Sequence, residues 1–152
     1  MNIPPDKIDS RFINGTNLNW LEGKTMVDLI NELKPDKVII DSPSNNVSRF
    51  KSFLKFHLKT EAELIVEHKA DQNYPVVGAA SILAKVERDK EMKDLSEKLH
   101  MELGSGYPSD PRAIKAVKMM IHTPLEKYVR RTWYTFSRVK GEKEQRRLED
   151  FE

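Results

Sequence analysis

Hydrophobic and polar positions follow two different periods along this chain. In several stretches apolar side chains recur every three or four residues, which is the spacing of one helix face. This spacing predicts helices over residues 17–33, 47–58, 75–99 and 110–120. Two short runs rich in valine and isoleucine, at residues 37–41 and 62–68, are instead typical of buried parallel strands.

An asparagine and two prolines mark the ends of the predicted elements. Asn17 is suited to cap the first helix, Pro35 cannot continue that helix, and Pro75 suits the first turn of the longest one. Residues 1–16 show no clear period, so we expect an extended entry or a loop there. The order strand, helix, strand, helix indicates an α/β fold with a parallel pair of strands.

The composition narrows the class of protein. The 152 residues suffice for one domain, and no apolar stretch approaches the roughly 20 residues that cross a bilayer. The sequence contains no cysteine, which excludes disulfide scaffolds, thiolate zinc sites and thiol nucleophiles. No secretory-signal pattern follows Met1. We therefore expect a cytoplasmic protein that makes no contact with membranes.

Charge is distributed unevenly along the chain. Residues 112–147 hold eleven Lys or Arg against three Asp or Glu, whereas residues 1–111 carry a net charge of −3. We therefore divide the chain into an α/β part, residues 1–111, and a basic helical C-terminal region, residues 112–152. The basic region suits contact with a polyanion, and a solvated helix face is the alternative.

Two aspartates follow the two predicted strands. Asp41 ends the first strand, and Asp71 lies just after the second, ahead of the helix that begins near Pro75. Ligands of parallel sheets collect at the carboxyl ends of the strands, so both side chains are expected at one sheet edge. Paired ionised carboxylates there suit Mg²⁺ or Mn²⁺. The alternative is that Asp71 caps a helix and Asp41 forms a turn.

Several segments resemble type 2 ribonuclease H, the archaeal ribonuclease HII family. EHKADQNYPVVGAASILAKVERD, residues 67–89, is similar to the family signature, and GSGYPSDPR, residues 104–112, resembles the loop that follows it in archaeal members. The strand DKVIID ends thirty residues before Asp71, the separation expected between the family's third and fourth active-site acids. Near the start of the chain, IPPDKID and NLNWLE also resemble the family.

The resemblance implies a ribonuclease H-like fold and an endonuclease that cuts the RNA strand of RNA/DNA hybrids, including at single ribonucleotides embedded in DNA. Four acids would hold two divalent ions, Mg²⁺ or Mn²⁺, and Asp41 and Asp71 match two of the four. Tyr107 matches the tyrosine that packs against the sugar beside the cleavage point; filling a turn is its alternative role. Lys69 and Lys85 are candidates for phosphate contact, with ordinary surface pairing as their alternative.

One family segment has no counterpart in this sequence. The family begins with a strand carrying Asp-Glu-Ala-Gly-Arg-Gly, which supplies the first two acids and a loop that senses the 2′-hydroxyl. We therefore expect the chain to be a C-terminal portion with a partial sheet: a fragment, a naturally split subunit or a truncated gene product. For cleavage it is expected to need the N-terminal segment from elsewhere, for example from a partner chain. The alternative is a non-catalytic remnant that binds the hybrid or a sliding clamp.

The end of the chain carries a possible clamp-binding motif. Gln145, Leu148 and Phe151 have the spacing of the Q-x-x-L-x-x-F motif that docks into the sliding clamp, PCNA. A polar first residue would be held by hydrogen bonding, and the apolar pair would fill a hydrophobic groove. Glu152 stands where the motif usually has a second aromatic residue.

Overall fold

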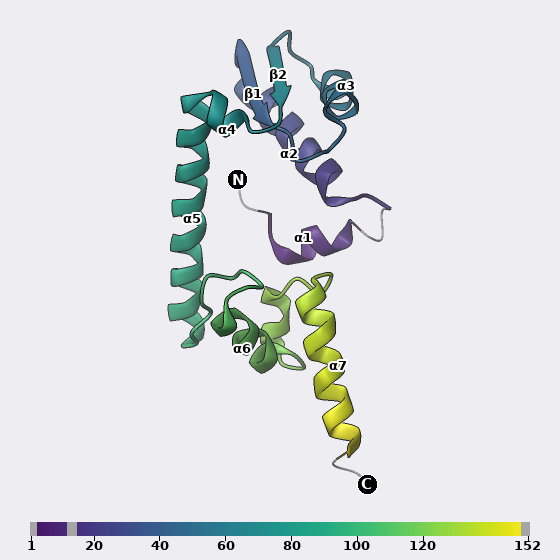
Figure 1. Cartoon of the computed structure of the whole chain (residues 1–152), viewed down its shortest axis with the longest axis vertical. Helices are drawn as coiled ribbons and strands as arrows, with labels where there is room; N and C mark the ends of the chain where they lie inside the picture. The colour runs from purple at the N-terminus through teal and green to yellow at the C-terminus, as the bar shows by residue number, and fades with distance from the viewer. Residues whose placement is uncertain (1–2, 12–14, 150–152) are drawn as a thin grey trace. The chain divides into compact units, whose positions relative to one another are not determined.

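The chain forms two compact units, which we describe separately. The structure, a computed structural model, describes residues 3–11 and 15–149 (Figure 1). One unit comprises residues 14–85, and the other comprises residues 1–13 together with residues 86–152. The helices after residue 111 pack against Met92, Leu95 and Leu99 in the second unit. The boundary set by packing, between residues 85 and 86, therefore differs from the boundary at residue 112 that the charge distribution suggested.

The first unit begins with two helices whose starts are capped by asparagine. In α2 (Leu18–Leu33) the Asn17 side chain accepts a hydrogen bond from the Trp20 amide, as the sequence predicted. In α3 (Val47–His57) Asn46 accepts one from the amide of Arg49. Each cap satisfies an N–H group that the helix itself leaves unpaired. The predicted helical ranges are therefore confirmed to within a residue.

The two strands pair in parallel, which confirms the predicted fold class. β1 (Lys37–Asp41) lies beside β2 (Glu63–Glu67) (Figure 1). The register sets Asp41 opposite Glu67. Side chains alternate between the two faces of a sheet. One face joins α2 and α3 in a core of buried residues: Val27, Ile30, Ile40, Phe50, Leu54, Leu64 and Val66. The opposite face carries Ile39 and, by the same alternation, Asp41.

A short helix separates β2 from the longest helix of the chain. α4 (Ala70–Asn73) was not predicted as an element of its own, whereas α5 (Pro75–Leu99) begins at the predicted proline. No residue of α5 is buried. Its aliphatic side chains Val76, Ile82, Leu83 and Val86 are 57% to 67% exposed. Such a row of exposed aliphatic groups is unusual on a helix of a water-exposed domain.

The second unit is helical and has its own core. It contains α6 (Pro111–Met120), a 3₁₀ helix η1 (Pro124–Tyr128) and α7 (Tyr134–Glu149). Its buried residues are Leu103, Ala116, Val117, Met120, Ile121, Val129, Phe136 and Val139. Trp133 packs against this core, which agrees with an anchoring role for that side chain.

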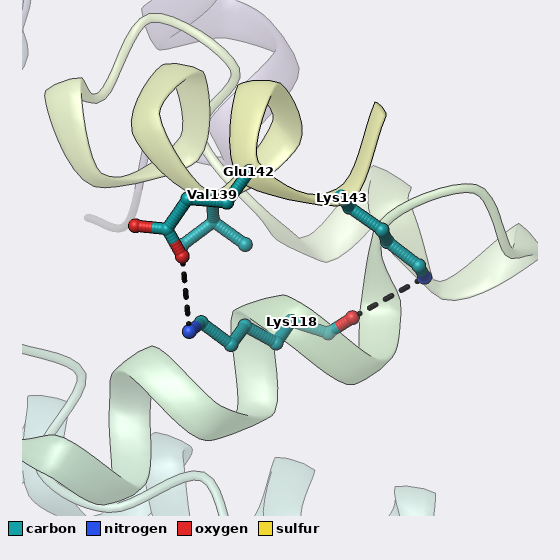
Figure 2. A pocket seen from close by; sticks show the side chains of 4 residues that line it. All are labelled: Lys118, Val139, Glu142 and Lys143. Carbon is teal, nitrogen blue, oxygen red and sulfur yellow. Dashed lines mark hydrogen bonds and ion pairs between the residues drawn. The ribbon is translucent and has the colours of Figure 1, made fainter. Parts of the chain in front are cut away.

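Polar contacts fasten α7 to the end of α6. The Lys143 ammonium donates to the Lys118 carbonyl at 3.4 Å (Figure 2). It also donates to the Ile121 carbonyl at 3.0 Å. The Lys118 ammonium lies 3.1 Å from the Glu142 carboxylate. Cations close to the last carbonyls of a helix satisfy groups that have no intrahelical partner. The first turns of α7 are therefore part of the packed unit.

The expectation of a loop over residues 1–16 is wrong for one segment. α1 (Pro5–Ser10) is helical, and the Asp9 carboxylate accepts hydrogen bonds from the amide of Arg131 at 2.8 Å and the hydroxyl of Thr132 at 2.7 Å. A helix this short has no apolar period and little stability of its own. Contacts to residues more than a hundred positions away hold it, and the local sequence does not reveal them.

Among the described residues, none of the helices combines the length and apolar character required to cross a bilayer.

Candidate active site

Asp41 accepts a hydrogen bond from the turn that leads to Asp71. The Lys69 amide donates to Asp41 Oδ1 at 2.9 Å, and this bond joins the end of β1 to the start of α4. Asp71 lies in the first turn of α4, two residues after Lys69. Both aspartates are exposed. The structure therefore sets two carboxylates at the carboxyl ends of the parallel strands, where the sequence predicted them.

The backbone at Lys69 adopts a conformation that favours glycine. Its φ and ψ are 58° and 35°, in the left-handed region, and a side chain there costs roughly 1–2 kcal/mol. Three backbone contacts define this turn: the amide of Lys69 on Asp41, and its carbonyl accepting from Gln72 and Asn73 at 2.9 and 3.3 Å. The lysine side chain is exposed, as is that of Lys85 on α5.

Gly78 allows α5 to approach Asp71 closely. A Cβ atom at Gly78 would lie 3.0 Å from the Asp71 carbonyl oxygen, tighter than ordinary van der Waals contact. The atom it would meet belongs to the backbone, so the conflict cannot be relieved by turning a flexible side chain. The glycine thus sets the separation between the first turn of α5 and the segment that carries Asp71.

Glu67 is a member of this edge that the sequence reasoning missed. It is opposite Asp41 in the strand register, and its Oε1 accepts a hydrogen bond from the Asn73 amide group at 2.6 Å. The bond ties the end of β2 to the last residue of α4. No motif in the sequence marks it, although the position of Glu67 at the end of a predicted strand was an available signal.

The two aspartates suit a hard divalent cation by their chemistry. Carboxylate oxygens are the ligands that Mg²⁺ prefers, and exposure leaves room for the water molecules that such ions retain. Within the described part of the chain, no three Asp, Glu or His side chains are grouped so that they could hold a metal ion. Asp41 and Asp71 therefore fit as part of a ligand set, and the set is incomplete in these residues.

Tyr107 belongs to the second unit and lies in a glycine-rich loop. Its ring is stacked by the Arg88 guanidinium, whose carbon lies 4.5 Å from the ring centroid, and the same group donates to the phenol oxygen. Gly106, next to it, has φ of 74°, and a Cβ there would come within 3.0 Å of the Met92 methyl. Tyr107 is 49% exposed, so the loop presents part of its side chain to solvent.

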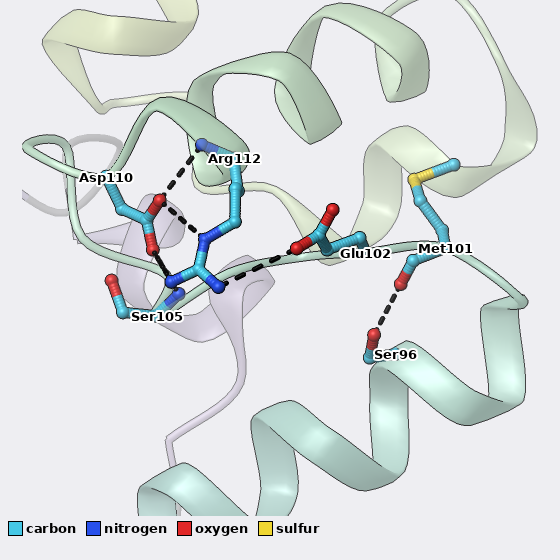
Figure 3. Close-up of polar contacts among 6 residues, drawn as sticks. All are labelled: Ser96, Met101, Glu102, Ser105, Asp110 and Arg112. Carbon is cyan, nitrogen blue, oxygen red and sulfur yellow. Dashed lines mark hydrogen bonds and ion pairs between the residues drawn. The ribbon is translucent and has the colours of Figure 1, made fainter.

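Asp110 anchors this loop. Its carboxylate accepts hydrogen bonds from the amides of Ser105 and Arg112, at 2.8 and 2.9 Å, and from the guanidinium of Arg112 (Figure 3). The Arg112 side chain, followed by the amides, holds the pKa of Asp110 well below its ordinary value. The loop also requires glycine at position 104. The φ of Gly104 is 64°, and a Cβ there would lie 2.7 Å from Asp110 Oδ2.

The structure describes only part of the proposed clamp motif. Gln145 lies exposed on α7, and Leu148 is within the helical backbone of α7. Phe151 lies outside the described residues.

Comparisons with known proteins agree with the resemblance in the sequence. The family model of Ribonuclease HII matches residues 2–136. A ribonuclease HII of Methanocella arvoryzae is 41% identical over 152 residues, which cover 99% of this chain and 68% of that protein. Across the curated relatives considered, the chain spans 60% to 68% of the relative's length.

Two solved structures are similar over most of the chain. The crystal structure of the ribonuclease H2 from Pyrococcus horikoshii OT3 has a TM-score of 0.78 and 41% identity, covering 92% of this chain and 66% of that one. The structure of the PCNA:RNase HII complex from Archaeoglobus fulgidus has a TM-score of 0.77 and 34% identity, covering 92% of this chain and 67% of that one.

Proposed function

The chain belongs to the ribonuclease HII family, and from this membership we propose that it forms part of a metal-dependent endonuclease. The substrates are RNA/DNA hybrids and DNA with single embedded ribonucleotides, cut on the 3′-oxygen side of a phosphodiester. The observation that carries the proposal is the hydrogen bond from the Lys69 amide to Asp41, which joins the strand end to the turn before Asp71.

In this proposal Asp41 and Asp71 supply oxygen ligands for Mg²⁺ or Mn²⁺. The chemistry that two such ions supply when bound is activation of water and stabilisation of the departing 3′ oxygen in an in-line displacement. Tyr107 packs against the sugar beside the cleaved bond, with Arg88 stacked on its ring as support. Lys69 and Lys85 contact backbone phosphates, which position the substrate without reading its sequence.

In this proposal the remaining ligands come from a segment carrying Asp-Glu-Ala-Gly-Arg-Gly, which is not among these 152 residues. Two carboxylates are too few for a two-metal site. The third carboxylate at this edge, Glu67, is bound by Asn73, and the described residues contain no group of three acids or histidines that could hold a metal ion. The face of the sheet that carries Ile39 has room for more structure. There Ile39, Val76, Val77 and Ala80 line an open hollow of about 320 Å³. If the added segment covered this hollow and the exposed aliphatic side chains of α5, the apolar area removed from water would stabilise the complex.

Reconstitution tests this function. The chain is mixed with a polypeptide that carries the Asp-Glu-Ala-Gly-Arg-Gly strand, and cleavage of an end-labelled RNA/DNA hybrid is followed in Mg²⁺ and in Mn²⁺. We expect cleavage that rises with partner concentration, with DNA duplex and single-stranded RNA left intact. A complex that co-elutes yet cuts no hybrid in either ion overturns the catalytic proposal. Cleavage by the chain alone overturns the need for a partner.

A sliding clamp is the second partner we propose. The family relative from Archaeoglobus fulgidus was solved in complex with PCNA, and the motif residues Gln145, Leu148 and Phe151 are in the last eight of this chain. The proposed clamp contact fits the alternative function as well, in which the chain is a remnant that binds a clamp or hybrid without cutting. The two functions separate in the reconstitution assay, because only the first yields cleaved product.

Calorimetry with PCNA tests the clamp contact. Phe151→Ala is expected to weaken binding by tenfold or more, because a buried aromatic anchor at an interface contributes about 2 kcal/mol or more. Tyr134→Ala, which removes an exposed aromatic ring from the first residue of α7, is the matched control. Point variants are preferable to truncation after Arg138, because Val139 lies in the core and Lys143 binds the end of α6. Unchanged affinity in Phe151→Ala would leave the motif a coincidence of spacing.

A further inference from the structure

A row of aromatic rings lies on the surface formed by α2 and α3. The rings of Trp20 and Phe53 are 4.7 Å apart between centroids, those of Phe53 and His57 4.4 Å, and those of His57 and Phe56 5.0 Å. The guanidinium of Arg49 lies over the Trp20 ring, 5.5 Å from its centroid. The four rings therefore form one continuous series with a cation at one end.

This series borders an open hollow. Its volume is about 510 Å³, and the residues lining it are Gly15, Thr16, Trp20, Lys24, Arg49, Ser52, Phe53, Phe56 and His57. We call this set the α2–α3 aromatic surface. Phe56 is 84% exposed, an unusual degree for a phenylalanine within a folded helix. The hollow thus combines the exposed rings of Phe56 and His57 with the cations of Lys24 and Arg49. The rings of Trp20 and Phe53 are partly buried and pack against the core, which fixes the inner part of the series.

The positive charge of residues 47–60 indicates which kind of ligand the α2–α3 aromatic surface binds. Residues 47–60, which include α3, hold four Lys or Arg and no Asp or Glu. A surface that docks an apolar protein segment has no need of this charge. Cations interleaved with exposed rings are the combination by which proteins hold single-stranded nucleic acid, with phosphates on the cations and bases on the rings.

The surface is on the opposite side of the sheet from the Asp41 carboxylate. α2 and α3 cover the sheet face that carries Ile40 and Leu64, whereas alternation sets Asp41 on the other face with Ile39. No residue of the surface belongs to the edge formed by Asp41 and Lys69. A ligand bound on the α2–α3 aromatic surface therefore makes contacts that the cleavage site does not require.

We propose that the α2–α3 aromatic surface binds a single-stranded segment of nucleic acid. A base stacks on the exposed ring of Phe56, and Arg49 and Lys24 contact neighbouring phosphates. The Nδ1–H of His57 donates to the Phe53 carbonyl at 2.8 Å, which holds the imidazole ring in its place in the series. The contact is independent of base sequence, because every base has a face that can stack.

Binding of fluorescein-labelled oligothymidylate of twenty nucleotides tests the proposal, measured by anisotropy with EDTA present. Phe56→Ala is expected to weaken binding about 5- to 150-fold, the range for losing one stacked base. Phe56→Leu keeps an apolar side chain and removes the ring, so it should lose as much. Affinity retained in Phe56→Leu and lost in Phe56→Ala would indicate apolar docking and overturn the stacking proposal.

Charge variants and a fluorescence reporter locate the contact. Arg49→Ala should weaken binding and lower its salt dependence, whereas Lys98→Ala, which removes a cation from α5, should change neither. In a Trp133→Phe chain Trp20 is the remaining tryptophan, and its emission should be quenched by the oligonucleotide. Binding without quenching would place the nucleic acid elsewhere and overturn the assignment. Because no metal or cleavage is involved, these outcomes are independent of the proposed catalysis.

Discussion

The acidic sheet edge and the glycine loop differ in how much of their structure they supply themselves. In the glycine loop, Asp110 is bound by two amides and a guanidinium, and Tyr107 is stacked by Arg88. At the acidic edge one amide contacts Asp41, and both aspartates are exposed. The loop is held together by its own contacts, whereas the acidic edge presents carboxylates that form only part of a metal-ligand set.

The difference follows from what each region does with its carboxylates. A carboxylate that accepts several hydrogen bonds is occupied and serves structure, as the lowered pKa of Asp110 indicates. A carboxylate with spare lone pairs at a strand end is available to a cation. Hydrogen-bond occupancy therefore separates the structural aspartate from the candidate metal ligands in this chain.

The largest expected effect comes from removing a charge at the edge. Asp41→Asn or Asp71→Asn in the reconstituted enzyme should lower the cleavage rate at least about a thousandfold, because several kcal/mol of transition-state stabilisation depend on each ligand. Circular dichroism should stay unchanged, since the amide keeps the side-chain size. Rates near that of the unmodified chain at saturating Mg²⁺, in either variant, would reject the metal assignment.

A methyl group near Asp71 should have a smaller effect. Gly78→Ala brings a Cβ against the Asp71 carbonyl, and displacement by a fraction of an ångström should reduce cleavage about tenfold. Gly141→Ala is the matched control, because a Cβ there meets nothing within 4 Å. It should raise the free energy of unfolding by roughly 0.5–1 kcal/mol and leave cleavage unchanged. Equal behaviour of both variants would contradict the role of Gly78.

Two variants of Lys69 separate its backbone from its side chain. Both Lys69→Gly and Lys69→Ala remove the side chain, but only alanine keeps a Cβ in the left-handed conformation. The glycine variant should be more stable by about 1 kcal/mol in denaturant unfolding. If the lysine contacts phosphate, hybrid affinity should fall by the same factor in both. Affinity that falls in only one variant would assign the effect to the backbone of the turn.

The smallest expected effect is a pH dependence at the glycine loop. The pKa of Asp110 is lower in the folded chain than in the unfolded one, where it is about 3.9. Its stabilisation is therefore complete above about pH 4 to 5 and is lost as the pH falls toward the folded value. Asp110→Asn should be less stable than the unmodified chain at pH 7, and the difference should shrink below about pH 4. A difference that is constant from pH 7 to pH 3 would contradict this account.

Several elements followed from local sequence because their determinants are local. Asn17 caps α2 as predicted, Pro75 starts α5, and the two β-branched runs form a parallel pair. Apolar period, capping side chains and proline all act within a few residues. The positions of Asp41 and Asp71 at the strand ends followed from the same signals, together with the rule that parallel strands share a carboxyl edge.

Other features depend on residues far apart in the chain, which no local pattern reports. The Asp9 carboxylate in α1 binds the backbone amide of Arg131, and the rings of Trp20 and Phe53 meet only when α2 packs on α3. The sequence by itself determined the two strands, the helices with a clear apolar period and the order of the acids. Only the tertiary structure decided that the Lys69 amide binds Asp41, which lies 28 residues earlier in the chain. Such contacts arise from long-range packing. The chain entropy lost in forming them is offset by burial of the whole core, so no single segment of the sequence reveals them.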